Sequence, residues 1–189
     1  MEHKQDKVIF TIREEFYSKV ELSTLEFFYS QTEKSLNEKL KTFEIMSDRS
    51  YRFLSILLPI VLGLFGYSIT QIVNSNFTVL LLISFVSFSV LSYSCYCLYQ
   101  NLFPKEIMSG GSNPKDLFNE TILSNEGDTQ KISALLWECQ NYQNRIDFNE
   151  IKNWERLQRF NRSLSSIRFL LILDLSIAVV FLFFRLFGL

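Results

Sequence analysis

Apolar residues dominate one uninterrupted stretch, residues 53–103, which contains no Asp, Glu, Lys, Arg or His. A helix needs about 20 mostly apolar residues to cross a bilayer, so this stretch is long enough for two spans. A soluble helix of this length would carry a charged face. Asn74, Ser75 and Asn76 interrupt the stretch where a tight turn would lie. The pattern therefore predicts a transmembrane hairpin, with spans at about 53–73 and 77–99.

A third apolar run covers residues 167–187, and we expect the last segment, 167–189, to form a third span. The remaining segments, 1–52 and 104–166, carry charges of both signs. They are predicted to be an N-terminal amphipathic helix region and a linker followed by a long helix. The expected fold class is all-α: an integral membrane protein with three transmembrane helices and a cytosolic helical region.

Helical periodicity marks both charged segments. After an extended lead to residue 13, the pattern predicts helix from Glu14, and from about Ser35 the helix could run into the membrane without a break. Its apolar stripe is Phe16, Val20, Leu25, Phe28, Leu36, Leu40 and Phe43. In the linker, Pro104 ends the second span, and Asn113 and Pro114 start a short helix that runs to about Leu123. The long helix then repeats apolar residues at Ile132, Leu135, Cys139, Tyr142 and Ile146. That stripe could pack on the N-terminal helix or on its copy in another subunit.

Charge indicates the orientation and excludes some functions. The 19 basic and 20 acidic residues give a net charge of −1, which argues against general nucleic-acid binding. Basic residues gather before the first and third spans, whereas the loop between the first two spans has no charge. The positive-inside rule therefore predicts a cytoplasmic N-terminus and a C-terminus on the opposite side.

Three groups of residues in or near the spans are candidate functional sites. Asp174 is the one acid within a span, roughly 10 Å deep if the membrane begins near Ile167. Three interpretations are open for Asp174: a structural partner such as a serine, a tyrosine or Arg168, a place on an ion path, or an interfacial position. Ser84, Ser87 and Ser94 share one side of the second span. Either they form hydrogen bonds to other helices and to backbone carbonyls of their own helix, or they line a pore. Pro59, Gly63 and Gly66 in the first span either allow close helix packing or form a gating hinge.

Four basic residues before the third span form another candidate site: Lys152, Arg156, Arg159 and Arg162. They either anchor the helix to anionic headgroups or contact the phosphates of a nucleotide or oligonucleotide. The sequence has no catalytic triad, phosphate-binding glycine loop or metal-ligand cluster, and its one histidine is His3. We therefore expect neither an enzyme nor a cofactor nor a metal site.

The linker and the long helix carry a resemblance. The segments Leu102-Phe103-Pro104 and Gly111-Ser112-Asn113-Pro114 precede a helix with Gln140, Asn144, Asn149 and Lys152. This layout resembles the small multi-pass membrane effectors of bacterial antiphage defence, the SLATT-like class and the Hailong-type channel effector. A third span after the long helix departs from the plain two-span SLATT pattern.

The resemblance implies an inner-membrane pore with a periplasmic C-terminus and a cytoplasmic sensor region. It further implies abortive infection triggered by a nucleotide signal or by a partner such as a nucleotidyltransferase. Three spans cannot enclose an aqueous path alone, so a channel requires a homo-oligomer in lipid, for which we expect a tetramer. The alternative is a non-conducting scaffold that tethers a cytosolic coiled-coil interaction module.

Overall fold

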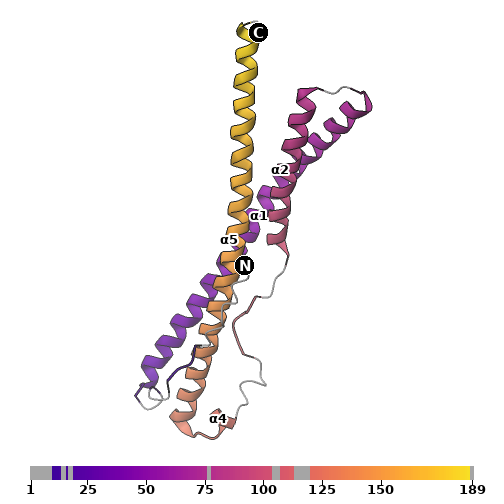
Figure 1. Cartoon of the computed structure of the whole chain (residues 1–189). Helices are drawn as coiled ribbons and strands as arrows, with labels where there is room; N and C mark the ends of the chain where they lie inside the picture. The colour runs from indigo at the N-terminus through magenta and orange to yellow at the C-terminus, as the bar shows by residue number, and fades with distance from the viewer. Residues whose placement is uncertain are drawn as a thin grey trace. The chain divides into compact units, whose positions relative to one another are not determined.

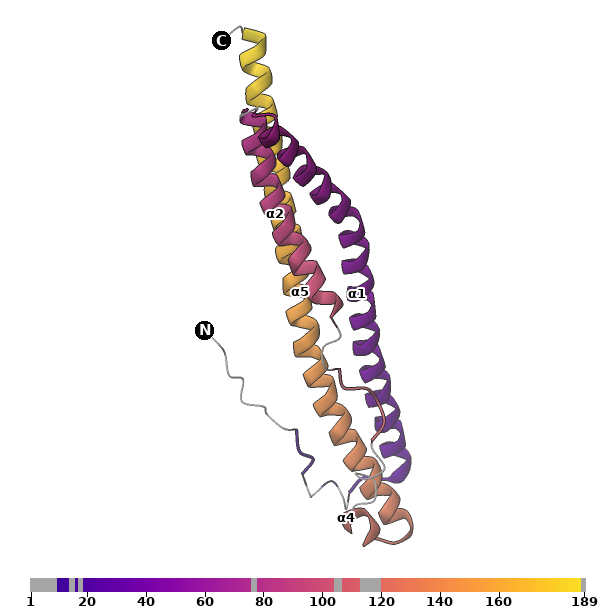
Figure 2. The same cartoon turned by 90° about the vertical axis from the view of Figure 1, so that its right-hand side faces the viewer.

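The computed structural model describes residues 10–13, 16, 19–75, 78–103, 107–112 and 120–187, without the side chains of residues 121, 181, 182 and 185–187. The elements are α1 (Leu22–Val73), α2 (Val79–Leu102), α4 (Glu120–Leu123) and α5 (Gly127–Phe187) (Figures 1 and 2). No strand occurs in these described segments. Three of the helices are long and apolar enough to cross a membrane, namely α1, α2 and α5. The predicted all-α membrane fold is confirmed.

The helices begin and end close to several expected positions. The turn after α1 includes Asn74 and Ser75, and Ser75 adopts a left-handed backbone with φ of 55°. Of the other predicted turn and linker residues, Asn76, Pro104, Asn113 and Pro114 lie outside the described residues. The part of the predicted short helix that the structure describes is α4.

The predicted start of the first helix at Glu14 is wrong, because α1 begins at Leu22. Residues 10–13 are not helical, in agreement with the predicted extended lead, and the N–H of Phe16 donates to the Arg13 carbonyl. Side chains of α5 hold the lead in place. Asn144 accepts a hydrogen bond from the N–H of Phe10, and Gln140 accepts one from that of Ile12. These tertiary bonds favour an extended backbone over another helical turn.

The chain divides into two compact units, to both of which α1 and α5 contribute. Unit 1 comprises Met1–Phe43 and Glu106–Asn153, and unit 2 comprises Glu44–Lys105 and Trp154–Leu189. In unit 1, α1 packs on α5 through two apolar clusters, one around Leu25 and Leu136 and one around Leu36 and Ile146. The apolar stripe of α5 therefore packs on the N-terminal helix of its own chain, the first of the two expected partners.

Polar side chains on α5 also fix the linker in unit 1. The Asn149 side chain accepts a hydrogen bond from the N–H of Met108 at 3.1 Å and donates one to the Met108 carbonyl at 2.9 Å. Arg145 donates to the carbonyls of Ser109 and Gly111. Each of these bonds replaces one that the linker backbone would otherwise make to water. The segment can therefore lie against α5 without forming secondary structure.

Unit 2 has an apolar core and an apolar exterior. Its buried residues from all three helices include Leu57, Leu98 and Leu170, and the rings of Phe53 and Phe160 pack edge to face at 5.5 Å. Large apolar side chains also cover the outside, including Leu62, Leu80, Leu82, Phe169 and Ile172, each at least 60% exposed. Such a surface is stable against lipid and not against water, which fits three membrane spans.

A buried polar cluster joins the three helices of unit 2. Arg156 of α5 is 2% exposed and donates to Ser47 Oγ of α1 at 2.8 Å and to the Asn101 carbonyl of α2. The Asn101 amide in turn donates to Ser50 Oγ at 3.2 Å and to the Arg156 carbonyl at 3.1 Å. We call these four residues the Arg156 cluster. Because every bond in it joins two different helices, it fixes their register.

Replacing Arg156 by alanine should therefore destabilise the protein. The variant leaves buried acceptors without donors, which costs about 2–4 kcal/mol in the free energy of unfolding. Unfolding in increasing SDS, followed by circular dichroism, measures the change. Arg159→Ala is the matched control, since Arg159 makes a partly exposed pair with Glu155 at 3.4 Å that contributes under about 1 kcal/mol. Equal effects of the two substitutions would contradict the role of the cluster.

Candidate functional site

The carboxylate within the third span lies beside a serine of the second. Ser87 Oγ of α2 is 3.5 Å from both Oδ1 and Oδ2 of Asp174 on α5, which is long for a hydrogen bond from a hydroxyl. Ser87 is buried and Asp174 is partly exposed. A carboxylate accepts about four hydrogen bonds, and one hydroxyl at this distance supplies a weak one. The charge of Asp174 thus calls for further polar partners.

Asp174 lines a groove in unit 2, about 480 Å³ in volume, together with Ser84 and Ser87. The rest of the lining is largely apolar and comes from all three helices: Leu57, Ile60, Leu64, Tyr67, Leu80, Ile83, Leu91, Ile167, Leu170 and Leu171. We call this the Asp174 groove. It presents one negative charge within apolar walls, an arrangement that suits a cation or water and not an anion.

The three predicted pore serines are all buried and all hydrogen-bonded in the single chain. Ser84 shares a hydrogen bond with Ser68 of α1 at 3.1 Å. Ser94 donates to the carbonyls of Val90 at 3.1 Å and Ser163 at 3.4 Å. The bonds between helices and to the backbone that the sequence offered as one alternative are therefore present. Ser84 and Ser87 share the Asp174 groove, whereas Ser94 does not line it. The pore wall stays a prediction.

The four basic residues have different environments. Lys152 belongs to unit 1, with its ammonium 5.5 Å from the centre of the Phe148 ring. Arg156 is enclosed in its cluster, where burial and then the nearby charge of Arg159 lower its pKa to about 10, so it remains cationic at neutral pH. Arg159 pairs with Glu155. Arg162 is exposed. The phosphate contact stays a prediction, and of the four the exposed Arg162 suits it best.

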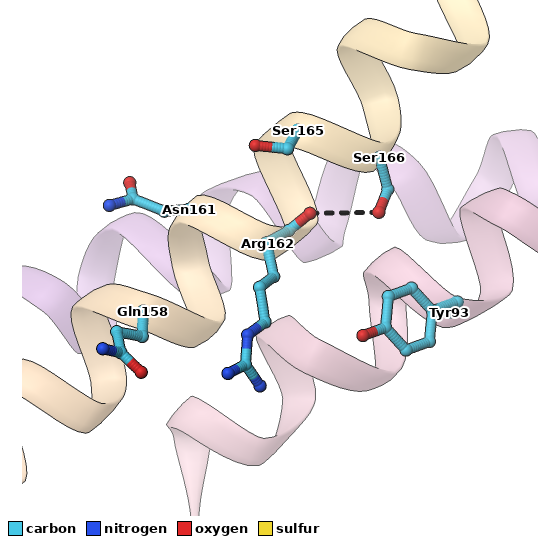
Figure 3. A pocket seen from close by; sticks show the side chains of 6 residues that line it. All are labelled: Tyr93, Gln158, Asn161, Arg162, Ser165 and Ser166. Carbon is cyan, nitrogen blue, oxygen red and sulfur yellow. Dashed lines mark hydrogen bonds between the residues drawn. The ribbon is translucent and has the colours of Figure 1, made fainter.

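Arg162 lies in a polar pocket of about 480 Å³ that the sequence did not indicate. Its lining is Tyr93 from α2 with Gln158, Asn161, Arg162, Ser165 and Ser166 from α5. Figure 3 shows Arg162 extending from α5 toward α2, and the hydroxyl of Tyr93 on α2 pointing toward the Arg162 side chain. We call this the Arg162 pocket. The signal in the sequence was the segment 161–166, polar at every position except Leu164, immediately before an apolar span.

The predicted hinge residues lie within α1. Pro59 is inside the helix and cannot donate to the Ser55 carbonyl, which weakens the helix there. A methyl group added at Gly63 or Gly66 would meet no atom within 4 Å. No described helix therefore packs closely on these glycines, and they remain open to lipid or to a second subunit. The hinge itself stays a prediction.

Among the residues that the structure describes, no group of His, Cys, Asp and Glu could hold a metal ion. No protein-family model, curated protein or solved structure matches this chain.

The Ser68–Ser84 bond offers a quantitative test of packing beside the Asp174 groove. In a double-mutant cycle with alanine at both positions, we expect a coupling energy of about 0.6 kcal/mol, typical of hydrogen bonds between membrane helices. SDS unfolding of the four proteins measures it. Ser68 with Ser89 is the control pair, since Ser89 is exposed and bonds the Phe85 carbonyl of its own helix. A coupling for the control pair as large as that for Ser68 and Ser84 would refute the contact.

Proposed function

We propose that this protein is a homo-oligomeric channel effector of the bacterial inner membrane, which conducts cations past Asp174. Following the resemblance noted above, its trigger is a nucleotide signal or a partner protein on the cytoplasmic side during phage infection. The observation that carries the proposal is the partly exposed carboxylate of Asp174, which has one weak hydrogen bond at membrane depth.

The energetics of that carboxylate support an aqueous path. An acid at the centre of a membrane helix costs about 2.5–3.5 kcal/mol or more, and such residues normally face water or a partner. The weak hydrogen bond from Ser87 does not offset the cost of placing this charge in the membrane. Three helices do not enclose a pore, so water would have to reach Asp174 between several copies of the chain. A ring of carboxylates around a symmetry axis would favour cations.

The exposed surface of α5 supports assembly. Among the residues that the structure describes, Leu170 is the last buried residue of the apolar core on this helix. Beyond it, large side chains are exposed, with Leu171, Ile172, Leu175 and Val179 between 57% and 68%. Asp174 lies within this segment. A second copy packed along it would place the carboxylate at a subunit interface, where several copies of Asp174 could face one axis.

Control from unit 1 is supported by the continuity of two helices. Both α1 and α5 extend from residues of unit 1 into residues of unit 2 without a break. A ligand or partner that altered the packing of α1 on α5 in unit 1 would therefore act on segments covalently continuous with the spans. The stacked rings of Tyr29 and Tyr142, 5.5 Å apart, lie in that packing. Their hydroxyls are 3.3 Å apart, and this bond, followed by burial, raises the pKa of Tyr29.

Asp174→Asn tests the proposal because it removes the charge and keeps the volume. With the full-length protein in proteoliposomes under an applied voltage, we expect cation flux to fall at least about tenfold, since a loss of about 1.4 kcal/mol of ion stabilisation has that effect. Ser176→Ala is the matched control, since Ser176 is exposed on the same span and bonds only the Ile172 carbonyl of its own helix. Its flux should equal that of the wild type.

Bacterial membrane potential, read with a voltage-sensitive dye during phage challenge, extends the test to the triggered state. Depolarisation by the wild type and not by Asp174→Asn, with equal cross-linked oligomer for both, is the expected result. Equal depolarisation by both proteins would remove Asp174 from the path. A wild type that forms oligomers but never depolarises the membrane would indicate the non-conducting scaffold.

A further inference from the structure

Two adjoining hollows on unit 2 differ in polarity. The Arg162 pocket is polar, whereas its neighbour of about 490 Å³ also contains Val90 and Phe169. Both hollows share Tyr93, Ser165 and Ser166. We call the second the Phe169 groove. Its lining is completed by Ser89, and the ring of Phe169 is 62% exposed. A polar pocket with a cation thus continues directly into an apolar groove.

The polar pocket has the chemistry of a phosphate site. The Arg162 guanidinium offers paired donors that match phosphate oxygens. Gln158, Asn161 and Ser165 add amide and hydroxyl donors, and no acid is part of the lining. Among the residues that the structure describes, Arg162 makes no ion pair, in contrast to Arg159 one turn earlier. Ser166 donates its hydroxyl proton to the Arg162 carbonyl at 3.0 Å, a bond that does not involve the guanidinium.

The position of the two hollows along α5 identifies the ligand class. Ser165 and Ser166 immediately precede Ile167, where the apolar span begins and where lipid headgroups would lie. A ligand that fills both hollows needs an anionic group, such as a phosphate, next to an apolar chain. An uncompensated arginine favours a headgroup with net negative charge over a zwitterionic one.

We infer that unit 2 binds one anionic phospholipid, with its phosphate on Arg162 and an acyl chain along Phe169. Tyr93 contributes to both parts, its hydroxyl toward the headgroup and its ring toward the chain, as expected of an interfacial tyrosine. The lipid would bridge α2 and α5 at the membrane boundary. The inference does not depend on ion conduction, because a scaffold with the same helices would bind the same lipid.

Native mass spectrometry of the purified full-length protein tests this site. The probes are phosphatidylglycerol, phosphatidylcholine with the same acyl chains, and inorganic phosphate or adenosine diphosphate as soluble competitors. We expect phosphatidylglycerol to bind at least about tenfold more tightly than phosphatidylcholine. Arg162→Gln should weaken phosphatidylglycerol about tenfold, the effect of losing one hydrogen bond to a charged group. Phe169→Ala should weaken both lipids.

The control is Arg168→Gln, which removes an exposed arginine of the same helix that lines neither hollow. Its lipid affinity should stay within twofold of the wild type. Arg162→Lys keeps the charge and removes the planar fork, so an intermediate affinity is expected if Arg162→Gln folds poorly. Circular dichroism and elution volume establish folding.

Three outcomes would overturn the inference. One is unchanged phosphatidylglycerol binding by a folded Arg162→Gln protein. Another is an equal loss in Arg168→Gln, which would indicate general surface charge. The third is displacement of the lipid by inorganic phosphate or adenosine diphosphate together with no effect of Phe169→Ala, which would assign the pocket to a soluble phosphate ligand.

Discussion

The structure of unit 2 depends on hydrogen bonds between helices that have apolar surfaces on all sides. Apolar side chains pack on lipid as well as on protein, so they give helices in a membrane little preference for one partner or register. The Arg156 cluster supplies that preference. It connects α5 to α1 through Ser47 and to α2 through Asn101, and each bond requires a defined position along the partner helix. Breaking it would strand a buried charge, which is far more costly than losing an exposed one.

The hydrogen bonds that hold α5 to α2 weaken along the helix. The Asn101 amide bonds the Arg156 carbonyl at 3.1 Å, Ser94 reaches the Ser163 carbonyl at 3.4 Å, and Ser87 reaches Asp174 at 3.5 Å. The two spans that form the hairpin, by contrast, are joined near their turn by the 3.1 Å bond of Ser68 with Ser84. The last part of α5 is therefore the least restrained span. A segment that is weakly held and carries an ionisable group is suited to the repacking that the proposed assembly and trigger would require.

Periodicity and charge predicted the elements well and the roles of single residues poorly. The absence of charge over residues 53–103 predicted the hairpin. Insertion into lipid depends on the composition of the segment itself, which can be read from the sequence. The three arginines 156, 159 and 162 have the same spacing and chemistry, yet one is buried, one is paired and one is exposed. Arg156 differs from the other two because its partners, Ser47 and Asn101, come from distant positions in the sequence. For the same reason Phe28, expected in the apolar stripe, is 49% exposed while the neighbouring Tyr29 stacks on Tyr142.

Polar residues on α5 therefore have three different roles, which depend on their surroundings. In unit 1, Gln140, Asn144 and Asn149 bond the main chain of segments without secondary structure, so the residues that carried the family resemblance have a structural reason to be there. In the first residues of α5 that belong to unit 2, Arg156 is enclosed by partners from the same chain. Further along, Arg162 and Asp174 have too few partners among the described residues for their charge. An ionised group in or beside a membrane must be compensated. The two proposals name what the single chain does not supply: a lipid headgroup for Arg162, and water or further copies of the chain for Asp174.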